Sequence, residues 1–284
     1  MKVWIDGCIV DGAEARVPVT DHGFLYGDGV FEGIRVYAGR VFRLDDHLER
    51  LRVSAAAIDL ELPGGKDGLR EIVQRTVDAF GASEAYIRLV VSRGEGPLGV
   101  DPTRCTAPRV VCIVDDVALY PAEKVARGVD LVTVSLRRPP YDVLDPRVKS
   151  LNYLNNVLAI AEARRRGADE ALILNQAGTI AEASGANVFL VRDGSLLTPP
   201  PADGALEGIT RRTVLELAAE LAVAAVERSL GRVDMLAADE AFLTGTGARV
   251  VPVRSLDGHA IGRGSTGPLT QRITEAFTHF ARTV

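Results

Sequence analysis

Two short segments of the chain carry residue types suited to holding a small anion. Gly208–Thr210 opens a predicted helix, where free backbone N–H groups and the positive end of the helix dipole favour negative charge. Thr244–Gly247 follows a predicted strand, and its glycines let backbone N–H groups turn toward one oxygen. Each segment alone is equally consistent with a plain helix cap or turn. Neither matches a Walker loop or a dinucleotide fingerprint, so neither indicates a nucleotide.

Two arginines stand where they could bind acidic groups. His47 and Arg50 are three residues apart on a predicted helix and share a face, and a guanidinium fork matches phosphate oxygens. On a predicted strand at 85–92, the period of two places Tyr86 and Arg88 on one side and most of the apolar residues on the other. That pairing suits recognition of a carboxylate. A solvated helix arginine and a wet edge strand are the alternatives that the residues leave open.

Lys149 lies just before a predicted helix at 151–166, and composition alone would make it a surface lysine. No zinc-ligand spacing, nucleophile elbow or pair of carboxylates stands out in the chain. The residues by themselves therefore indicate an enzyme-like protein with two anion-binding segments and no metal.

The elements that must position these residues are mixed helices and strands. Asp6–Gly7 joins two short apolar runs as a hairpin turn, and apolar residues at steps of three and four from 44 to 58 predict a helix. The pattern predicts an α+β fold. We expect a smaller N-terminal domain at 1–117, a polar linker at 118–125, and a larger C-terminal domain at 126–284 that carries Lys149.

Bulk composition narrows the class of protein. The 284 residues are 47% hydrophobic and 25% charged, which is typical of a globular chain. A formal net charge of −5 argues against nucleic acid or an anionic membrane surface as partner. No apolar run approaches the roughly 20 residues of a membrane span, and no signal-peptide pattern opens the sequence. Three cysteines without metal-ligand spacing indicate reduced thiols, and hence a cytoplasmic protein.

Four stretches in order, at 26–35, 149–156, 182–187 and 206–211, resemble the class IV aminotransferases, which are the fold type IV pyridoxal-phosphate enzymes. Within that family the sequence is most similar to branched-chain amino acid aminotransferases. The resemblance runs from Trp4 to Arg254 and implies a two-domain fold like that of D-amino acid aminotransferase.

The resemblance also implies a role for each matching residue. Lys149 corresponds to the lysine that forms a Schiff base with pyridoxal 5'-phosphate and moves the α-proton. Glu182 corresponds to the carboxylate beside the pyridine nitrogen, and Tyr153 to the hydroxyl beside the ring oxygen. Leu206 would pack on the ring. The phosphate would be bound by Arg50, Ile209, Thr210 and Thr246.

The implied reaction moves the amino group of leucine, isoleucine or valine to 2-oxoglutarate by a ping-pong mechanism. Tyr26, Phe31 and Tyr86 would form an apolar wall for the substrate side chain. Arg88 would bind the distal carboxylate of glutamate, while Tyr86 and the Thr246–Gly247 backbone would hold the α-carboxylate. The resemblance further implies a homodimer, or a larger homo-oligomer, in which the 96–102 loop reaches the neighbouring subunit's pocket.

Other activities of the same family stay open. D-amino acid aminotransferases carry an arginine and a histidine in the loop after the Tyr86 strand, but the loop here, Arg93–Val100, has no histidine. An amine transaminase of R selectivity and an aminodeoxychorismate lyase are further alternatives. Lyases tend to have threonine after the position of Phe31, where this chain has Glu32. A cofactor carrier without turnover is opposed by the complete set of Lys149, Glu182 and Tyr153.

Overall fold

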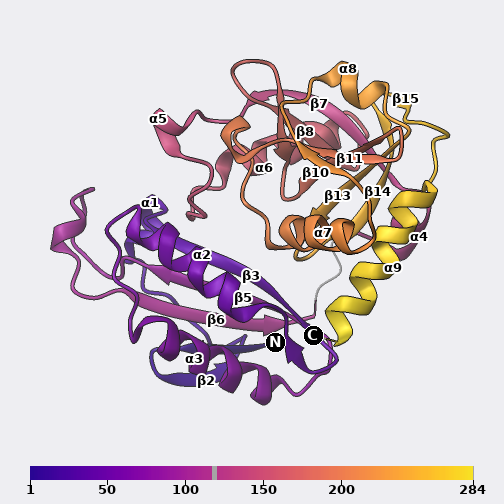
Figure 1. Ribbon diagram of the computed structural model, residues 1–284. Coiled ribbons are helices and arrows are strands. Elements are labelled where there is room, and N and C mark those ends of the chain that lie inside the picture. The colour runs from indigo at the N-terminus through magenta and orange to yellow at the C-terminus, as the bar shows by residue number, and fades with distance from the viewer. Residues whose placement is uncertain (117–119, 284) are drawn as a thin grey trace. The chain divides into compact units, whose positions relative to one another are not determined.

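The computed structural model describes residues 1–116 and 120–283 (Figure 1). The chain divides into two compact units. The first comprises residues 1–117 and 148–152, and the second comprises residues 118–147 and 153–284. Each unit has its own sheet and its own apolar core, so each is described separately.

The first unit is built on an antiparallel sheet. In its described part, six strands lie in the order β2-β1-β6-β5-β3-β4. The predicted hairpin at Asp6–Gly7 joins β1 to β2, because both residues take the positive φ angles that this turn needs. The strand bounds are Lys2–Ile5 (β1), Cys8–Asp11 (β2), Gly29–Tyr37 (β3), Arg40–Val41 (β4), Ala85–Ser92 (β5) and Arg109–Asp115 (β6).

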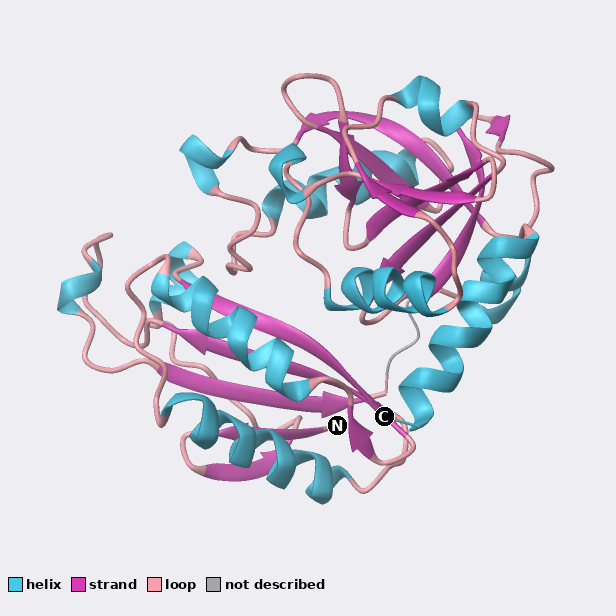
Figure 2. Ribbon diagram, viewed as in Figure 1, coloured by secondary structure: helices cyan, strands magenta, loops and turns pink. Residues whose placement is uncertain are grey.

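Two long helices cover this sheet, as Figure 2 shows. Helix α2 (Leu44–Ala56) packs on β3, and helix α3 (Gly65–Phe80) packs on β1 and β6. Their buried apolar side chains, such as Leu48 and Leu69, form one core with Ile34 and Ile87 of the strands. A short helix α1 (His22–Tyr26) precedes β3, and a 3-10 turn spans Pro102–Arg104.

The second unit holds a larger mixed sheet. Among the described residues its strands lie in the order β12-β11-β10-β13-β14-β7-β8-β9, with β15 beside β14. The pairs β14–β7, β7–β8 and β11–β12 are parallel, and the other pairs are antiparallel. The bounds are Val129–Arg137 (β7), Glu170–Leu174 (β8), Ile180–Ala183 (β9), Asn187–Arg192 (β10), Ser195–Thr198 (β11), Ala225–Glu227 (β12), Glu240–Gly245 (β13), Arg249–Leu256 (β14) and His259–Ala260 (β15).

Helices pack against this second sheet. Helix α6 contacts β7 and β8, while α7 and α9 contact each other and β13. No helix in the described parts of the chain is long and apolar enough to cross a membrane. The helix bounds are Ala122–Arg127 (α4), Tyr141–Leu144 (α5), Leu154–Arg165 (α6), Ile209–Glu220 (α7), Arg232–Leu236 (α8) and Pro268–Thr283 (α9), with a 3-10 turn at Pro201–Asp203.

The structure differs from the sequence-based expectations in two places that concern the site. Part of the expected linker, 118–119, lies outside the described residues, and its end at 122–125 belongs to helix α4. The helix expected from 151 begins at Leu154 instead. The reason is a tertiary contact: Leu151 N–H bonds the carbonyl of Gly29, and Ser150 bridges to Val30. Lys149 therefore lies in the first unit, and not in the C-terminal domain as expected.

Candidate active site

The backbone of Lys149 is fixed on both sides by the first unit. Its N–H donates to the hydroxyl of Ser54 on α2 at 3.1 Å. Its carbonyl accepts from the N–H of Phe31 on β3 at 3.0 Å. The side chain is only partly buried, so its amine can be reached while its Cα is held by a helix and a strand. A lysine anchored in this way suits covalent chemistry at the amine.

The ring of Phe31 lies close to two cationic groups. The Lys149 Nζ is 4.6 Å from the centre of this ring, and the guanidinium carbon of Arg88 is 4.5 Å from it. Arg88 also donates through Nη2 to the hydroxyl of Tyr86 at 3.3 Å. A Cβ on Gly33 would stand 2.0 Å from that hydroxyl, so only glycine leaves room for Tyr86 there. Phe31, Tyr86, Arg88 and Lys149 thus form one cluster on the first unit.

Arg50 belongs to a buried charge cluster around Glu32 of β3. Its Nε and Nη2 each donate to the Glu32 carboxylate at 2.7 Å. The Nδ1 of His47 lies 2.7 Å from the same carboxylate. His47 and Arg50 do share a helix face, as their spacing predicts, and the face points at Glu32. Because a guanidinium has five N–H groups, its bonds to Glu32 do not exhaust its capacity to serve a second anion.

Burial and charge set the protonation states in this cluster. Burial by itself would raise the pKa of the Glu32 carboxyl, but Arg50 and His47 together lower that pKa well below its usual value. Burial lowers the pKa of His47, and the Glu32 carboxylate beside it acts in the opposite direction. Sequence reasoning did not include Glu32 among the site residues, because its partners lie 15 and 18 positions away on another element.

The second unit brings the two anion-binding segments onto neighbouring elements. Helix α7 starts at Ile209 after Gly208, which has no side chain to cap the first N–H groups. Helix α7 packs on β13, which ends in the Thr244–Gly247 segment. The Thr244 hydroxyl is buried and has no hydrogen-bond partner in the described structure. An uncapped helix N-terminus and an unsatisfied hydroxyl, on elements that pack together, each suit an anion such as a phosphate ester.

Glu182 of β9 sits in a network of donors within the same unit. Its Oε1 accepts from Arg138 Nη2 at 2.8 Å. Its Oε2 accepts from Asn187 Nδ2 at 3.1 Å and from the Leu206 N–H at 3.0 Å. Asn187 also donates to the Leu206 carbonyl, and a Cβ on Gly208 would stand 2.0 Å from its Oδ1. Asn187 therefore ties the carboxylate to the segment that leads into α7.

The remaining predicted site residues fall into two groups. Tyr153 directly precedes α6, and Leu206 leads toward α7, while Thr246 and Gly247 follow the end of β13. Tyr26 is different, because its hydroxyl accepts from the Gly99 N–H at 2.8 Å. Tyr26 thus contacts the 96–102 loop. Arg138 and Asn187, like Glu32, were not among the predicted residues, since their roles depend on partners that lie on other elements.

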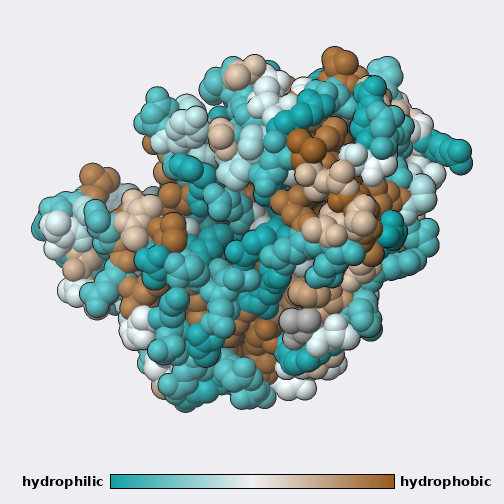
Figure 3. Space-filling model, in the orientation of Figure 1, coloured by the Kyte–Doolittle hydropathy of each residue, from teal (hydrophilic) through white to brown (hydrophobic). Residues whose placement is uncertain are grey.

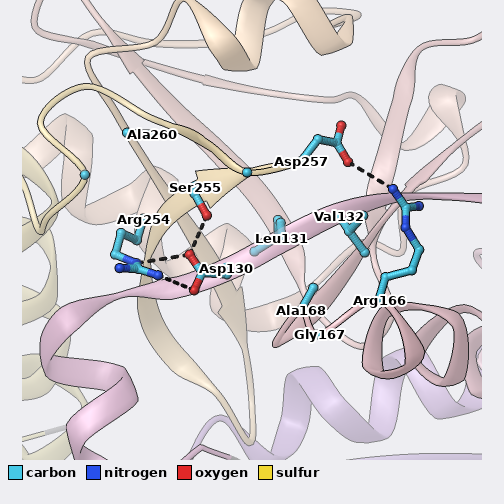
Figure 4. Close-up of a pocket in the computed structure, with 12 residues that line it drawn as sticks. Asp130, Leu131, Val132, Arg166, Gly167, Ala168, Arg254, Ser255, Asp257 and Ala260 are labelled. Atoms are coloured by element: carbon cyan, nitrogen blue, oxygen red, sulfur yellow. Dashed lines mark hydrogen bonds and ion pairs between the residues drawn. The ribbon is translucent and has the colours of Figure 1, made fainter.

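A cavity of about 580 Å³ lies in the second unit, and its lining includes none of the predicted site residues (Figure 4). It is lined by Asp130, Arg166, Arg254 and Asp257 around an apolar floor. Arg254 pairs with Asp130 at 3.0 Å through Nε, and Arg166 lies 3.9 Å from Asp257. Because these four charges face one another, none of them is left to attract a charged ligand.

Comparison with known proteins shows the family to which this chain belongs. The family model described as "Amino-transferase class IV" matches residues 29–256. The chain belongs to the class IV amino-transferase family. The matched span contains Lys149, Glu182 and both anion-binding segments of this class IV aminotransferase.

Three proteins illustrate its likeness to other family members. The branched-chain aminotransferase of Thermoproteus uzoniensis, solved with norvaline, is 41% identical with a TM-score of 0.92, over 99% of this chain and 95% of that one. The branched-chain amino acid aminotransferase of Thermobaculum terrenum, solved in its PLP-bound holo-form, is 33% identical. The two match with a TM-score of 0.90 over 99% of this chain and 94% of that one. The D-alanine aminotransferase of Bacillus licheniformis is 34% identical over 97% of this chain and 95% of its own length. The α+β class IV fold expected from sequence is confirmed.

Proposed function

We propose that this class IV aminotransferase uses pyridoxal 5'-phosphate to move the amino group of branched-chain L-amino acids to 2-oxoglutarate. The observation that carries the proposal is the Phe31 cluster, in which one aromatic ring is shared by a lysine amine and a guanidinium. An apolar ring suits leucine, and the guanidinium suits the second carboxylate of glutamate or 2-oxoglutarate. The likeness to two branched-chain enzymes supports the same substrates.

The chain's own groups fit the cofactor. When bound, pyridoxal phosphate supplies an electron-accepting ring and carries the amino group between the two half-reactions. Lys149 would hold the cofactor covalently and move the substrate's α-proton through its amine. Glu182 would accept a hydrogen bond from the pyridine N–H. The start of α7, with Ile209, Thr210 and the hydroxyl of Thr246, would receive the phosphate, and Arg50 would add its positive charge.

Leu206 and Tyr153 complete this assignment. Leu206 already donates its backbone N–H to Glu182, so the Leu206 backbone lies next to the carboxylate that would meet the pyridine nitrogen. It would pack on the ring face. Tyr153 would donate its hydroxyl to the ring oxygen. The Thr246–Gly247 backbone, with Tyr86, would hold the substrate α-carboxylate that every amino acid shares.

We also propose that the protein assembles at least as a homodimer in the cytoplasm. His22 and Tyr26 of α1 hold the 96–102 loop through Pro97 and Gly99. The loop's Leu98 and Val100 are 77% and 81% exposed, and Phe24 of α1 is 71% exposed. On the face that Figure 3 shows, brown hydrophobic residues interrupt a mostly hydrophilic surface. Large exposed apolar side chains on this loop and on α1 favour binding to another protein. We propose that this partner is a second copy of the chain.

An amino-donor screen tests the proposed substrates. The holoenzyme would be assayed with 2-oxoglutarate against L-leucine, L-isoleucine, D-alanine and R-1-phenylethylamine, which represent the family's competing activities. We expect the two branched-chain donors to give the highest kcat/KM. A preference for D-alanine over L-leucine would reject the branched-chain assignment and favour the D-amino acid alternative.

A further inference from the structure

Arg138 is a buried arginine that the proposed reaction does not yet use. It follows the last residue of β7 and is only 4% exposed. Its Nη2 donates to Glu182 at 2.8 Å, and its Nη1 donates to the side-chain oxygens of Asn155 and Asn156 at 3.2 and 3.3 Å. Its Nε has no partner in the described structure. Burying a guanidinium with one N–H unsatisfied is costly, so its position calls for a reason.

The surroundings hold Arg138 in one place. Asn156 is itself fixed by donating to the carbonyl of Ser184 at 2.6 Å. A Cβ on Gly204 would stand 2.9 Å from the Cγ of Arg138, so the glycine makes room for the arginine's stem. The backbone N–H of Arg138 donates to the Leu174 carbonyl at 2.9 Å. The charge is therefore preorganised beside the Glu182 carboxylate.

The charge matters because a buried carboxyl facing a pyridine nitrogen has two possible forms. In one, the proton stays on the carboxyl and the nitrogen is neutral. In the other, the carboxylate is ionised and the nitrogen carries the proton. Burial favours the neutral form, while a neighbouring cation favours the ionised carboxylate. Only a protonated nitrogen makes the ring a strong electron acceptor.

We propose that Arg138 is a positioning residue that keeps Glu182 ionised, and so keeps the proton on the pyridine nitrogen of the bound cofactor. The inference rests on the proposed function, because it assumes that Glu182 meets this nitrogen. Asn187 and the Leu206 N–H hold Oε2 of Glu182, while Arg138 provides the positive charge at Oε1. Arg138 itself touches neither substrate nor cofactor in this assignment.

The test reports directly whether the pyridine nitrogen of the bound cofactor is protonated. Apoprotein would be loaded with pyridoxal phosphate labelled with ¹⁵N in the ring, and the ¹⁵N resonance would report whether the nitrogen is protonated. We expect the wild type at the protonated position and Arg138→Gln shifted toward the unprotonated one. Arg138→Lys keeps the charge and should stay near the wild type. Single-turnover α-proton removal in Arg138→Gln should slow by about tenfold to a hundredfold, as for other residues that support a reactive group, with the KM for leucine little changed.

A matched control distinguishes the loss of the charge beside Glu182 from the general effect of replacing a buried arginine. Arg211 is also a buried arginine of the second unit with an unpartnered Nε, but it pairs with Glu227. Arg211→Met should lower stability and leave the ¹⁵N resonance unmoved. If Arg138→Gln folds poorly, the double variant Arg138→Gln/Glu182→Gln should recover thermal stability, since it removes both charges. Failure of that recovery would contradict the pairing.

The outcomes distinguish this inference from the proposed function. A wild-type resonance in Arg138→Gln, together with a shifted one in Glu182→Gln, overturns the role of Arg138 and leaves Glu182 as the partner of the nitrogen. An unshifted resonance in both variants removes Glu182 from the nitrogen, and Arg138 with it. Failure of the wild type to bind the labelled cofactor at all rejects the proposed function.

Discussion

The backbone of Lys149 makes structural hydrogen bonds, whereas its side-chain amine is proposed to do the chemistry. The backbone N–H and carbonyl bond to Ser54 and Phe31, and these bonds do not involve the side chain. Lys149→Ala should therefore fold normally and still lose the cofactor's visible absorption band and its covalent attachment. We expect turnover to fall at least about a thousandfold, as when a nucleophile is removed.

Absorption spectra and a transamination assay would check this prediction. Lys66→Ala is the control, because Lys66 is a lysine of the same unit that pairs with Glu49 on the surface. Normal turnover in Lys149→Ala would exclude this residue from the chemistry.

Arg88 separates the two kinds of substrate. Its guanidinium lies over the Phe31 ring and against the Tyr86 hydroxyl. Arg88→Ala removes the charged partner of a distal carboxylate, a loss of about 2–5 kcal/mol for glutamate, while leucine makes no such contact. The glutamate half-reaction should thus slow far more than the leucine half-reaction. Stopped-flow absorbance of each half-reaction gives the comparison, and equal losses would assign Arg88 to structure or to the shared α-carboxylate.

For single residues, the local sequence predicts which neighbours share the same helix or strand face. It does not predict the partners that lie on other elements. The spacing of His47 and Arg50 predicted their shared face, and the alternation along β5 predicted that Tyr86 and Arg88 lie together. Glu32 could not be found this way, because its pairing depends on how α2 packs on β3.

The contact between helix α2 and strand β3 depends on the Glu32 charge. Because the pKa of Glu32 is lowered in the folded protein, its ion pair stabilises the fold above the ordinary carboxyl pKa of 4.5, and this contribution is lost as the pH falls below that value. The unfolding free energy of the wild type should therefore fall more steeply than that of Glu32→Gln as the pH decreases from about 5 to about 3. Glu32→Gln should itself cost about 3–5 kcal/mol at pH 7, since it leaves Arg50 without its buried partner.

Urea unfolding at several pH values would measure how the unfolding free energy of the wild type and of Glu32→Gln changes with pH. Glu49→Gln is the matched control on the same helix, because Glu49 pairs with Arg52 and Lys66 in solvent and should contribute little. Parallel slopes for the wild type and Glu32→Gln would show that Glu32 does not link stability to pH.

Element boundaries were predictable where the chain decides them locally. The bounds of β5 match the prediction, since its alternation and its flanking polar residues are local. The expected helix start at 151 is wrong, because the segment 148–152 bonds to β3. A polar composition at 122–125 suggested a linker, yet α4 forms there with Glu123 in its first turn and Arg127 in its last, which suits the helix dipole.

For the whole molecule, the exposed 96–102 loop leads to a prediction about the proposed homodimer. Replacing Leu98 and Val100 by aspartate should weaken the proposed homodimer and lower activity at the same dilution, because charge replaces apolar surface at the contact. Light scattering with a parallel assay would follow both. Val233→Asp is the control, since Val233 is equally exposed on α8 of the other unit. An active monomer across dilution would refute the proposed homodimer.

The path of the chain limits how this protein could be recombined with a relative. Because residues 148–152 pair with β3 although the chain before and after them belongs to the second unit, a crossover near residue 117 does not exchange whole units. A chimaera made there would pair one parent's β3 with the other parent's lysine segment. Its Ser54 and Phe31 would then have to hold a foreign Lys149 backbone. A functional exchange of the first unit must carry five residues from the middle of the gene along with its beginning.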